Sequence, residues 1–144
     1  MSAPTFCLGI PHTPWVPARV ESLTKLLIAL GESEADGVLR ARRVFGERAL
    51  NHVWSEEMWR WGVSREGRSG GVDPTHFLTL QDDVKVAPNF WPALRAMVEA
   101  VPDEVIALEV VHPAAPLLAA KGHRWFTSPD CIVGVGYVLP MAAL

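Results

Sequence analysis

The chain has 144 residues, of which 49% are hydrophobic and 20% charged, and its formal net charge is −3. A chain of this length fits one domain and buries about two-thirds of its unfolded surface, and its apolar fraction excludes a disordered chain. The small negative charge offers no electrostatic argument for binding a nucleic-acid backbone. We therefore expect residues 1–144 to form a single domain.

The sequence indicates neither a membrane span nor a disulfide framework. No apolar run approaches the roughly 20 residues of a membrane-spanning helix, and residues 1–5 lack the basic start and apolar stretch of a signal peptide. Cys7 and Cys131 lie far apart in two apolar runs, which is typical of buried, reduced thiols. A cytoplasmic location is the expectation that follows.

The first part of the chain predicts a strand, a loop and a helix. Residues 6–10 (FCLGI) form an apolar run of strand length, and residues 11–17 (PHTPWVP) predict a loop because they contain three prolines. Apolar residues then recur at spacings of three, four and three, as on one face of a helix that ends at Gly31. These apolar residues are Val20, Leu23, Leu27 and Leu30.

A second strand and a second helix are predicted next. Residues 38–45 (VLRARRVF) are typical of a strand with partly exposed arginines, and residues 62–71 predict a glycine-rich loop. Between these segments, apolar residues recur at helical spacing, with Trp59 off the apolar face. The apolar face comprises Leu50, Val53, Trp54, Met58 and Trp61.

Residues 76–80 (HFLTL) are the clearest strand of the sequence. A third helix should follow it, with Asn89 as its cap and Pro92 in its first turn. Its expected apolar face comprises Phe90, Leu94, Met97 and Val101.

The last third of the chain predicts two strands joined by a loop. Residues 105–111 and 131–139 are apolar runs, and residues 113–125 are rich in proline, glycine and small residues. Gly134 and Gly136 indicate that another group approaches the last strand closely. The alternation of strands and helices predicts an α/β fold with a mostly parallel central sheet flanked by helices.

Two adjacent carboxylates follow the clearest strand, in the sequence THFLTLQDDV of residues 75–84. In an open α/β sheet, ligands bind outside the carboxyl ends of the strands. Side chains alternate in an extended segment, so Gln81 and Asp83 should share one face while Asp82 points the other way. One carboxylate would then bind Mg²⁺ or Mn²⁺ while its neighbour holds a water, a ribose hydroxyl or a base. The alternative is that the pair only forms a turn or caps the next helix.

The chain resembles the GT-A type glycosyltransferases, which use nucleotide sugars. The resemblance rests on residues 75–84 with the Pro-Asn-Phe segment 88–90, on the preceding helix with Trp54 and Trp61, and on the opening strand. Residues 125–140 (WFTSPDCIVGVGYVLP) are similar to the segment that forms the acceptor-side wall in such enzymes. The resemblance extends over most of the chain.

This resemblance implies a Rossmann-like nucleotide-sugar fold, bound Mn²⁺ or Mg²⁺, and transfer of a sugar from a nucleoside-diphosphate sugar to an acceptor hydroxyl. Asp83 matches the metal-binding acid of the family motif, and Asp82 matches its neighbour. Gln81 occupies a position that is often acidic in the family, which leaves one carboxylate fewer for the metal. A cation bridging both phosphates would neutralise the charge of the leaving group.

Further residues are assigned to the nucleotide by the same resemblance. His12, Thr13 and Arg19 follow the first strand and would contact the nucleotide. Ordinary loop polarity, or for Arg19 a charge at the start of a helix, is the alternative.

The acceptor side offers weaker candidates. Asp130 is the candidate catalytic base, and His112, at the carboxyl end of a predicted strand, is a candidate metal or phosphate ligand. Both are also typical turn residues beside a proline. An acceptor platform is a further interpretation of the run His123, Arg124 and Trp125.

The chain is short for a GT-A domain, so it is either a minimal or truncated enzyme or a domain completed by a partner. A nucleotide or nucleotide-sugar binding module without transfer activity is therefore the alternative function. A phosphate-handling enzyme of another class is a third, although no phosphate-binding glycine loop is present. Self-association to a homo-oligomer is expected if the apolar residues 138–144 lack a covering element.

Overall fold

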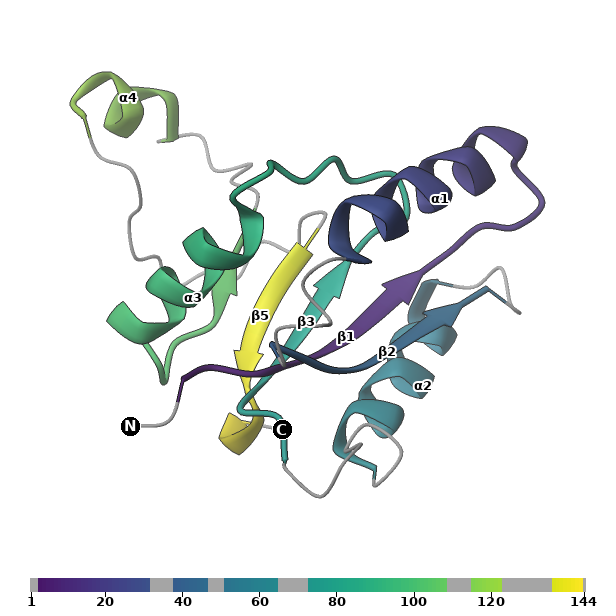
Figure 1. The fold of residues 1–144 in the computed structure, drawn as a ribbon, viewed down its shortest axis with the longest axis horizontal. Coiled ribbons are helices and arrows are strands. Elements are labelled where there is room, and N and C mark those ends of the chain that lie inside the picture. Colours follow the sequence, from purple (N-terminus) through teal and green to yellow (C-terminus); the bar gives the residue numbers. More distant parts are fainter. Residues whose placement is uncertain are drawn as a thin grey trace.

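The computed structural model describes residues 3–31, 38–46, 51–64, 73–108, 115–122 and 136–143. These residues form an α/β fold around a five-stranded sheet of strand order β2-β1-β3-β5-β4 (Figure 1). The strands are β1 (Phe6–Pro11), β2 (Leu39–Phe45), β3 (His76–Leu80), β4 (Ile106–Ala107) and β5 (Gly136–Pro140). The helices are α1 (Pro17–Gly31), α2 (Asn51–Val63), α3 (Phe90–Ala100) and α4 (Ala115–Ala120), and a 3-10 turn (Met141–Ala143) follows β5.

Helices pack on both faces of the sheet, because successive side chains of a strand point to opposite faces. Phe6, Leu8 and Ile10 of β1 belong to a core that also contains buried side chains of α1 and α3. Cys7, between them, belongs to a second core, in which Met58 of α2 packs. The sheet is therefore the middle layer between α1 and α3 on one face and α2 on the other.

The expectation of a mostly parallel sheet is wrong. β1 pairs in parallel with β2 and β3, but β5 is antiparallel to both of its neighbours, β3 and β4. The sheet is therefore mixed and open, which is compatible with a Rossmann-like fold. Gly136 explains the tight fit of β5, since a Cβ atom there would lie 2.8 Å from the backbone oxygen of Thr79 on β3. The close approach expected at this glycine is thus made by the neighbouring strand.

The predicted strands at residues 6–10, 38–45 and 76–80 are confirmed, and so are the three predicted helices. One prediction in the last third is wrong, since residues 115–120 form α4 where a loop was expected. The strand expected at residues 105–111 is confirmed in part as β4 (Ile106–Ala107), and residues 109–111 lie outside the described residues.

The buried faces of the helices differ in detail from the predicted ones. In α3 the buried side chains are Trp91, Leu94 and Val98, while Met97 is 38% exposed. In α1, Leu26 and Leu30 are buried, whereas Val20 is 42% exposed. Apolar spacing shows which residues share a helix face but not which part of that face meets the sheet, so the buried residues differ from the expected ones.

Two further predicted contacts differ from what the structure contains. Trp59 packs against the second core, where its ring stacks on Tyr137 and lies against Phe77, so it does not face away. Asn89 lies at the N-cap position of α3, but its side chain makes no capping hydrogen bond.

The C-terminal apolar residues and the helices bear on the predicted partners. Val138 is fully buried, and Leu139 and Met141 pack against the second core, so these side chains lend no support to the predicted self-association. Among the described helices, none has the length and apolar character needed to cross a membrane.

Candidate functional site

The candidate site lies beside β1, where successive strands are added first on one side of β1 and then on the other. From β1 the chain passes through α1 to β2 on one side, while β3 pairs with the other side of β1 (Figure 1). Ligands of open α/β sheets bind in the crevice at such a switch point, outside the carboxyl ends of the strands. His12 and Thr13 directly follow β1, and Gln81, Asp82 and Asp83 directly follow β3. The fold therefore brings two separate polar segments to this one edge.

Asp82 is the centre of the site. Its side chain is completely buried and is held by Arg19, Thr13 and His12. Oδ1 accepts a hydrogen bond from Arg19 Nε at 2.6 Å and forms an ion pair with Arg19 Nη2. Oδ2 accepts from the backbone N–H of Thr13 at 2.9 Å and contacts His12 Nδ1 at 2.7 Å. Both carboxylate oxygens of Asp82 are therefore engaged by groups of the chain itself.

These partners determine the ionisation of Asp82. Burial by itself would raise the pKa of Asp82, but the hydrogen bonds from Arg19, Thr13 and His12 outweigh burial and hold the pKa below its usual value. The same pairing raises the pKa of Arg19, mainly through its hydrogen bond to Asp82. Asp82 and Arg19 therefore form an ion pair between the end of β3 and the first turn of α1, in which the carboxylate is buried and the guanidinium is partly exposed.

Asp83 differs from its neighbour in exposure. Arg19 Nη1 donates to Asp83 Oδ2 at 2.6 Å, so one guanidinium joins both carboxylates. The Asp83 side chain is 40% exposed, whereas that of Asp82 is inaccessible. Both residues lie in a turn in which Val84 N–H donates to the carbonyl of Gln81 at 3.2 Å. Only Asp83 of the pair is therefore accessible to a ligand.

The β1–α1 loop is rigid because its backbone is bonded at both ends. His12 N–H donates to the carbonyl of Phe45 on β2, and Val16 N–H donates to that of Thr13. Arg19, in the first turn of α1, in turn donates from its backbone to Val16, so the helix start and its guanidinium are positioned together. The prolines of the segment restrict the backbone further.

The structure brings together five residues that the sequence singled out, namely His12, Thr13, Arg19, Asp82 and Asp83. Gln81 is half-buried at the start of the same turn. Asp130, His112 and the predicted acceptor platform at residues 123–125 lie outside the described residues, so their roles remain predictions.

Of the two adjacent carboxylates, only Asp83 can reach a divalent cation. The Asp82 side chain is inaccessible, whereas that of Asp83 is 40% exposed and is paired through Oδ2 with Arg19. No group of three or more metal-binding side chains exists within the described ranges. Mg²⁺ and Mn²⁺ are commonly held by one or two carboxylates together with substrate phosphates, so a metal at Asp83 fits if the ligand supplies phosphate oxygens.

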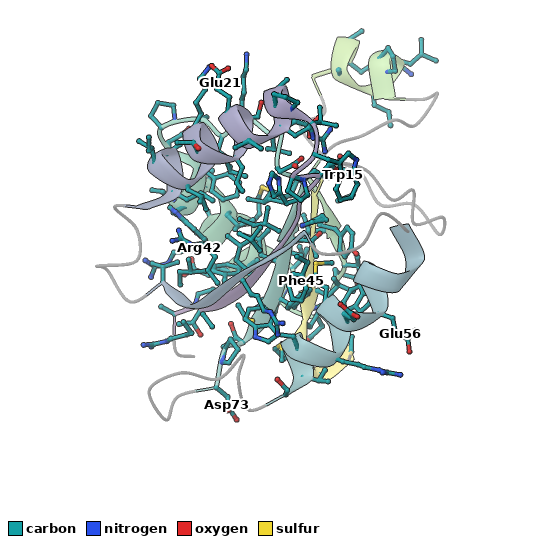
Figure 2. All side chains as sticks on the ribbon, turned by 90° about the vertical axis from the view of Figure 1, so that its right-hand side faces the viewer. Trp15, Glu21, Arg42, Phe45, Glu56 and Asp73 are labelled. Atoms are coloured by element: carbon teal, nitrogen blue, oxygen red, sulfur yellow. The ribbon has the colours of Figure 1, made fainter. Side chains whose placement is uncertain are left out.

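Trp15 belongs to the same loop and was given no role from the sequence. This residue projects from the loop at the start of α1 and is 55% exposed (Figure 2). In the sequence it lies between His12 and Arg19, both of which contact Asp82.

Comparisons with family models, with curated proteins and with solved structures found no match to this chain.

Proposed function

We propose that the chain is a glycosyltransferase that binds a nucleoside-diphosphate sugar with Mn²⁺ or Mg²⁺ at Asp83 and transfers the sugar to an acceptor hydroxyl. The proposal combines the sequence resemblance to GT-A glycosyltransferases with the geometry at the switch point. The observation that carries it is the buried carboxylate of Asp82, which ties the β1–α1 loop to the end of β3 and leaves Asp83 at the surface.

The charges at this edge suit a diphosphate bound together with a cation. Two carboxylates and the Arg19 guanidinium sum to one negative charge, which by itself disfavours an anionic ligand. A divalent cation at Asp83 reverses that sign, and its open positions accept phosphate oxygens. A bound cation would also neutralise charge on the departing diphosphate. Arg19 holds the orientation of Asp83, since its Nη1 donates to Asp83 Oδ2.

A binding module without transfer activity is the second candidate, and the burial of Asp82 favours it. Gln81 replaces a carboxylate at the position that is often acidic in the family, and Asp82 is inaccessible to a metal. A single exposed carboxylate supports weaker metal binding than two or three. The two candidates share the ligand and differ only in turnover.

Thermal unfolding with a panel of nucleoside diphosphates and nucleotide sugars, with and without Mn²⁺, tests the shared ligand. A ligand at about 100 times its Kd stabilises the native state by about 2.7 kcal/mol, which for a domain of this size raises Tm by roughly 10 °C. We expect such a shift for one nucleotide in the presence of Mn²⁺. We expect Asp83→Asn to abolish the metal-dependent part.

Glu56→Gln is the matched control, since it also removes one exposed carboxylate that is paired with an arginine, Arg60, but on α2. It should leave the nucleotide shift unchanged. Release of nucleoside diphosphate from the bound nucleotide sugar, dependent on an added acceptor, then separates the transferase from the binding module. The proposal fails if no nucleotide raises Tm, or if Asp83→Asn retains the full Mn²⁺-dependent shift.

A further inference from the structure

His12 is held in the site by a carboxylate that cannot itself reach a ligand. Its side chain is only 9% exposed, and Nδ1 lies 2.7 Å from Asp82 Oδ2. Nε2, the other ring nitrogen, has no hydrogen-bond partner among the described residues. Nε2 is also not fully buried. Nε2 is therefore a largely enclosed polar atom with an opening to solvent.

The contact with Asp82 decides which nitrogen of the neutral ring carries the proton. An ionised carboxylate only accepts hydrogen bonds, so Nδ1 must donate. In the neutral ring the proton is then on Nδ1, and Nε2 presents a lone pair. A carboxylate behind a histidine determines the tautomer and the ring orientation in the same way at many metal and catalytic sites.

The position of the ring is fixed as well as its tautomer. The backbone N–H of His12 donates to Phe45, and the next residue donates from its backbone to Asp82. The Cδ2 edge of the ring lies beside Gly46, where a Cβ atom would be 3.4 Å away. The direction of the Nε2 lone pair is therefore set before any ligand binds. A ligand that donates a hydrogen bond to Nε2 then binds at a lower cost in side-chain entropy.

We propose that His12 is a specificity-determining residue of the site, and that its Nε2 accepts a hydrogen bond from a hydroxyl group of a sugar ring in the bound ligand. The inference rests on the proposed function. The ring hydroxyl belongs either to the ribose of the nucleotide or to the sugar that the nucleotide carries. An ionised phosphate offers only acceptors, so it cannot satisfy this lone pair. Asp82 acts through His12 as a positioning residue.

Calorimetric titration of the wild-type protein at pH 8 with Mn²⁺ tests the inference. The ligands are the nucleoside diphosphate that gives the thermal shift, its 2′-deoxy and 3′-deoxy forms, and the corresponding nucleotide sugar with and without hydroxyls on the carried sugar. We expect loss of one of these hydroxyls to weaken binding about tenfold, because the largely enclosed Nε2 atom then loses its hydrogen-bond donor. The deoxy form that shows the loss identifies the ring that contacts His12.

Two variants assign that loss to His12. His12→Phe keeps a ring without an acceptor, and it should bind the hydroxyl and deoxy forms equally. His12→Gln supplies an amide oxygen, and it should restore part of the discrimination. Circular dichroism and Tm show whether each variant is folded. Nitrogen-15 spectra of the wild-type histidines provide a test that needs no variant and should show His12 protonated at Nδ1.

The outcomes separate this inference from the proposed function. If no nucleotide or nucleotide sugar binds, both are wrong. If nucleotides bind but the wild type binds every deoxy form as tightly as the hydroxyl form, only the role of His12 is wrong. The same holds if His12→Phe weakens the hydroxyl and deoxy forms by the same factor, because the variant then still discriminates between them. Protonation of His12 at Nε2 in the free protein would also overturn this role.

Discussion

Replacement of Asp82 by asparagine tests the central interaction of the fold and of the site. Asparagine has nearly the same shape but no charge, and one of its two terminal atoms is a donor. Its oxygen can still accept from Arg19, but its NH₂ group then faces the donors that Oδ2 binds in the wild type. His12 can adopt its other tautomer and accept from the NH₂ group, whereas the backbone N–H of Thr13 is left without a partner.

The expected loss of stability follows from burial and from the partners. Breaking a buried ion pair on one side costs about 3–5 kcal/mol, and a buried donor without a partner costs about 1–3 kcal/mol. The Arg19 side chain is 29% exposed and keeps its contact with Asp83, so water and Asp83 offset part of the loss. We expect Asp82→Asn to lower the free energy of unfolding by about 3 kcal/mol.

Asp83→Asn is the matched control, because the same change falls on the neighbouring residue with the same arginine partner. The Asp83 carboxylate is 40% exposed, so its loss should cost less than about 1 kcal/mol. Urea unfolding at pH 7, followed by circular dichroism, measures both variants. Equal losses for the two variants, or a loss below about 1 kcal/mol for Asp82→Asn, would refute this account of the site.

The dependence on pH provides an independent check of the same interaction. The pKa of folded Asp82 is lower than its usual value of 3.8, so its ionisation stabilises the fold above that pH. This contribution is lost as the pH falls below 3.8 through the depressed pKa of the folded state. The stability difference between wild type and Asp82→Asn should therefore stay constant from pH 7 to pH 5 and shrink below pH 3.8. A difference that is unchanged down to the acid transition would contradict the ion pair.

Two further predictions concern the second core. A Cβ atom at Gly62 would lie 2.6 Å from the ring of Phe77, which is fully buried, so Gly62→Ala should destabilise the protein by about 1–3 kcal/mol in urea unfolding, despite the helix propensity of alanine. Burial raises the pKa of the Cys7 thiol to about 12, so in a Cys131→Ser variant at pH 8 a thiol reagent should label Cys7 only after urea is added. Rapid labelling without urea would show that Cys7 is accessible in the native state.

The local pattern of the sequence was sufficient for several elements. The strands at residues 6–10 and 76–80 and the helix that ends at Gly31 could be predicted because apolar runs and helical spacing express the burial of neighbouring residues. The position of Asp82 and Asp83 at the carboxyl end of a strand could be predicted for the same reason. The resemblance to GT-A glycosyltransferases also assigned the loop after β1 to the site.

The different roles of the two aspartates could not be predicted from their order in the chain. Adjacent carboxylates are chemically equal in the sequence, and alternation only states that they point in different directions. Arg19 and Thr13 are more than 60 positions away from Asp82 in the chain, and it is their hydrogen bonds that bury one carboxylate and leave the other exposed. The partners of a buried charge are set by contacts that no local pattern records.

The sequence by itself thus determined the strands and helices from β1 to α3, and the segments that carry polar side chains at the ends of strands. Only the tertiary structure decided that β5 runs antiparallel between β3 and β4, that Trp91 and Val98 form the buried side of α3, and that Asp82 is enclosed. The physical reason is the distance along the chain between the residues that interact. Periodicity reflects interactions between residues a few positions apart, whereas strand direction, helix rotation and the pairing of charges depend on segments that meet only when the chain folds.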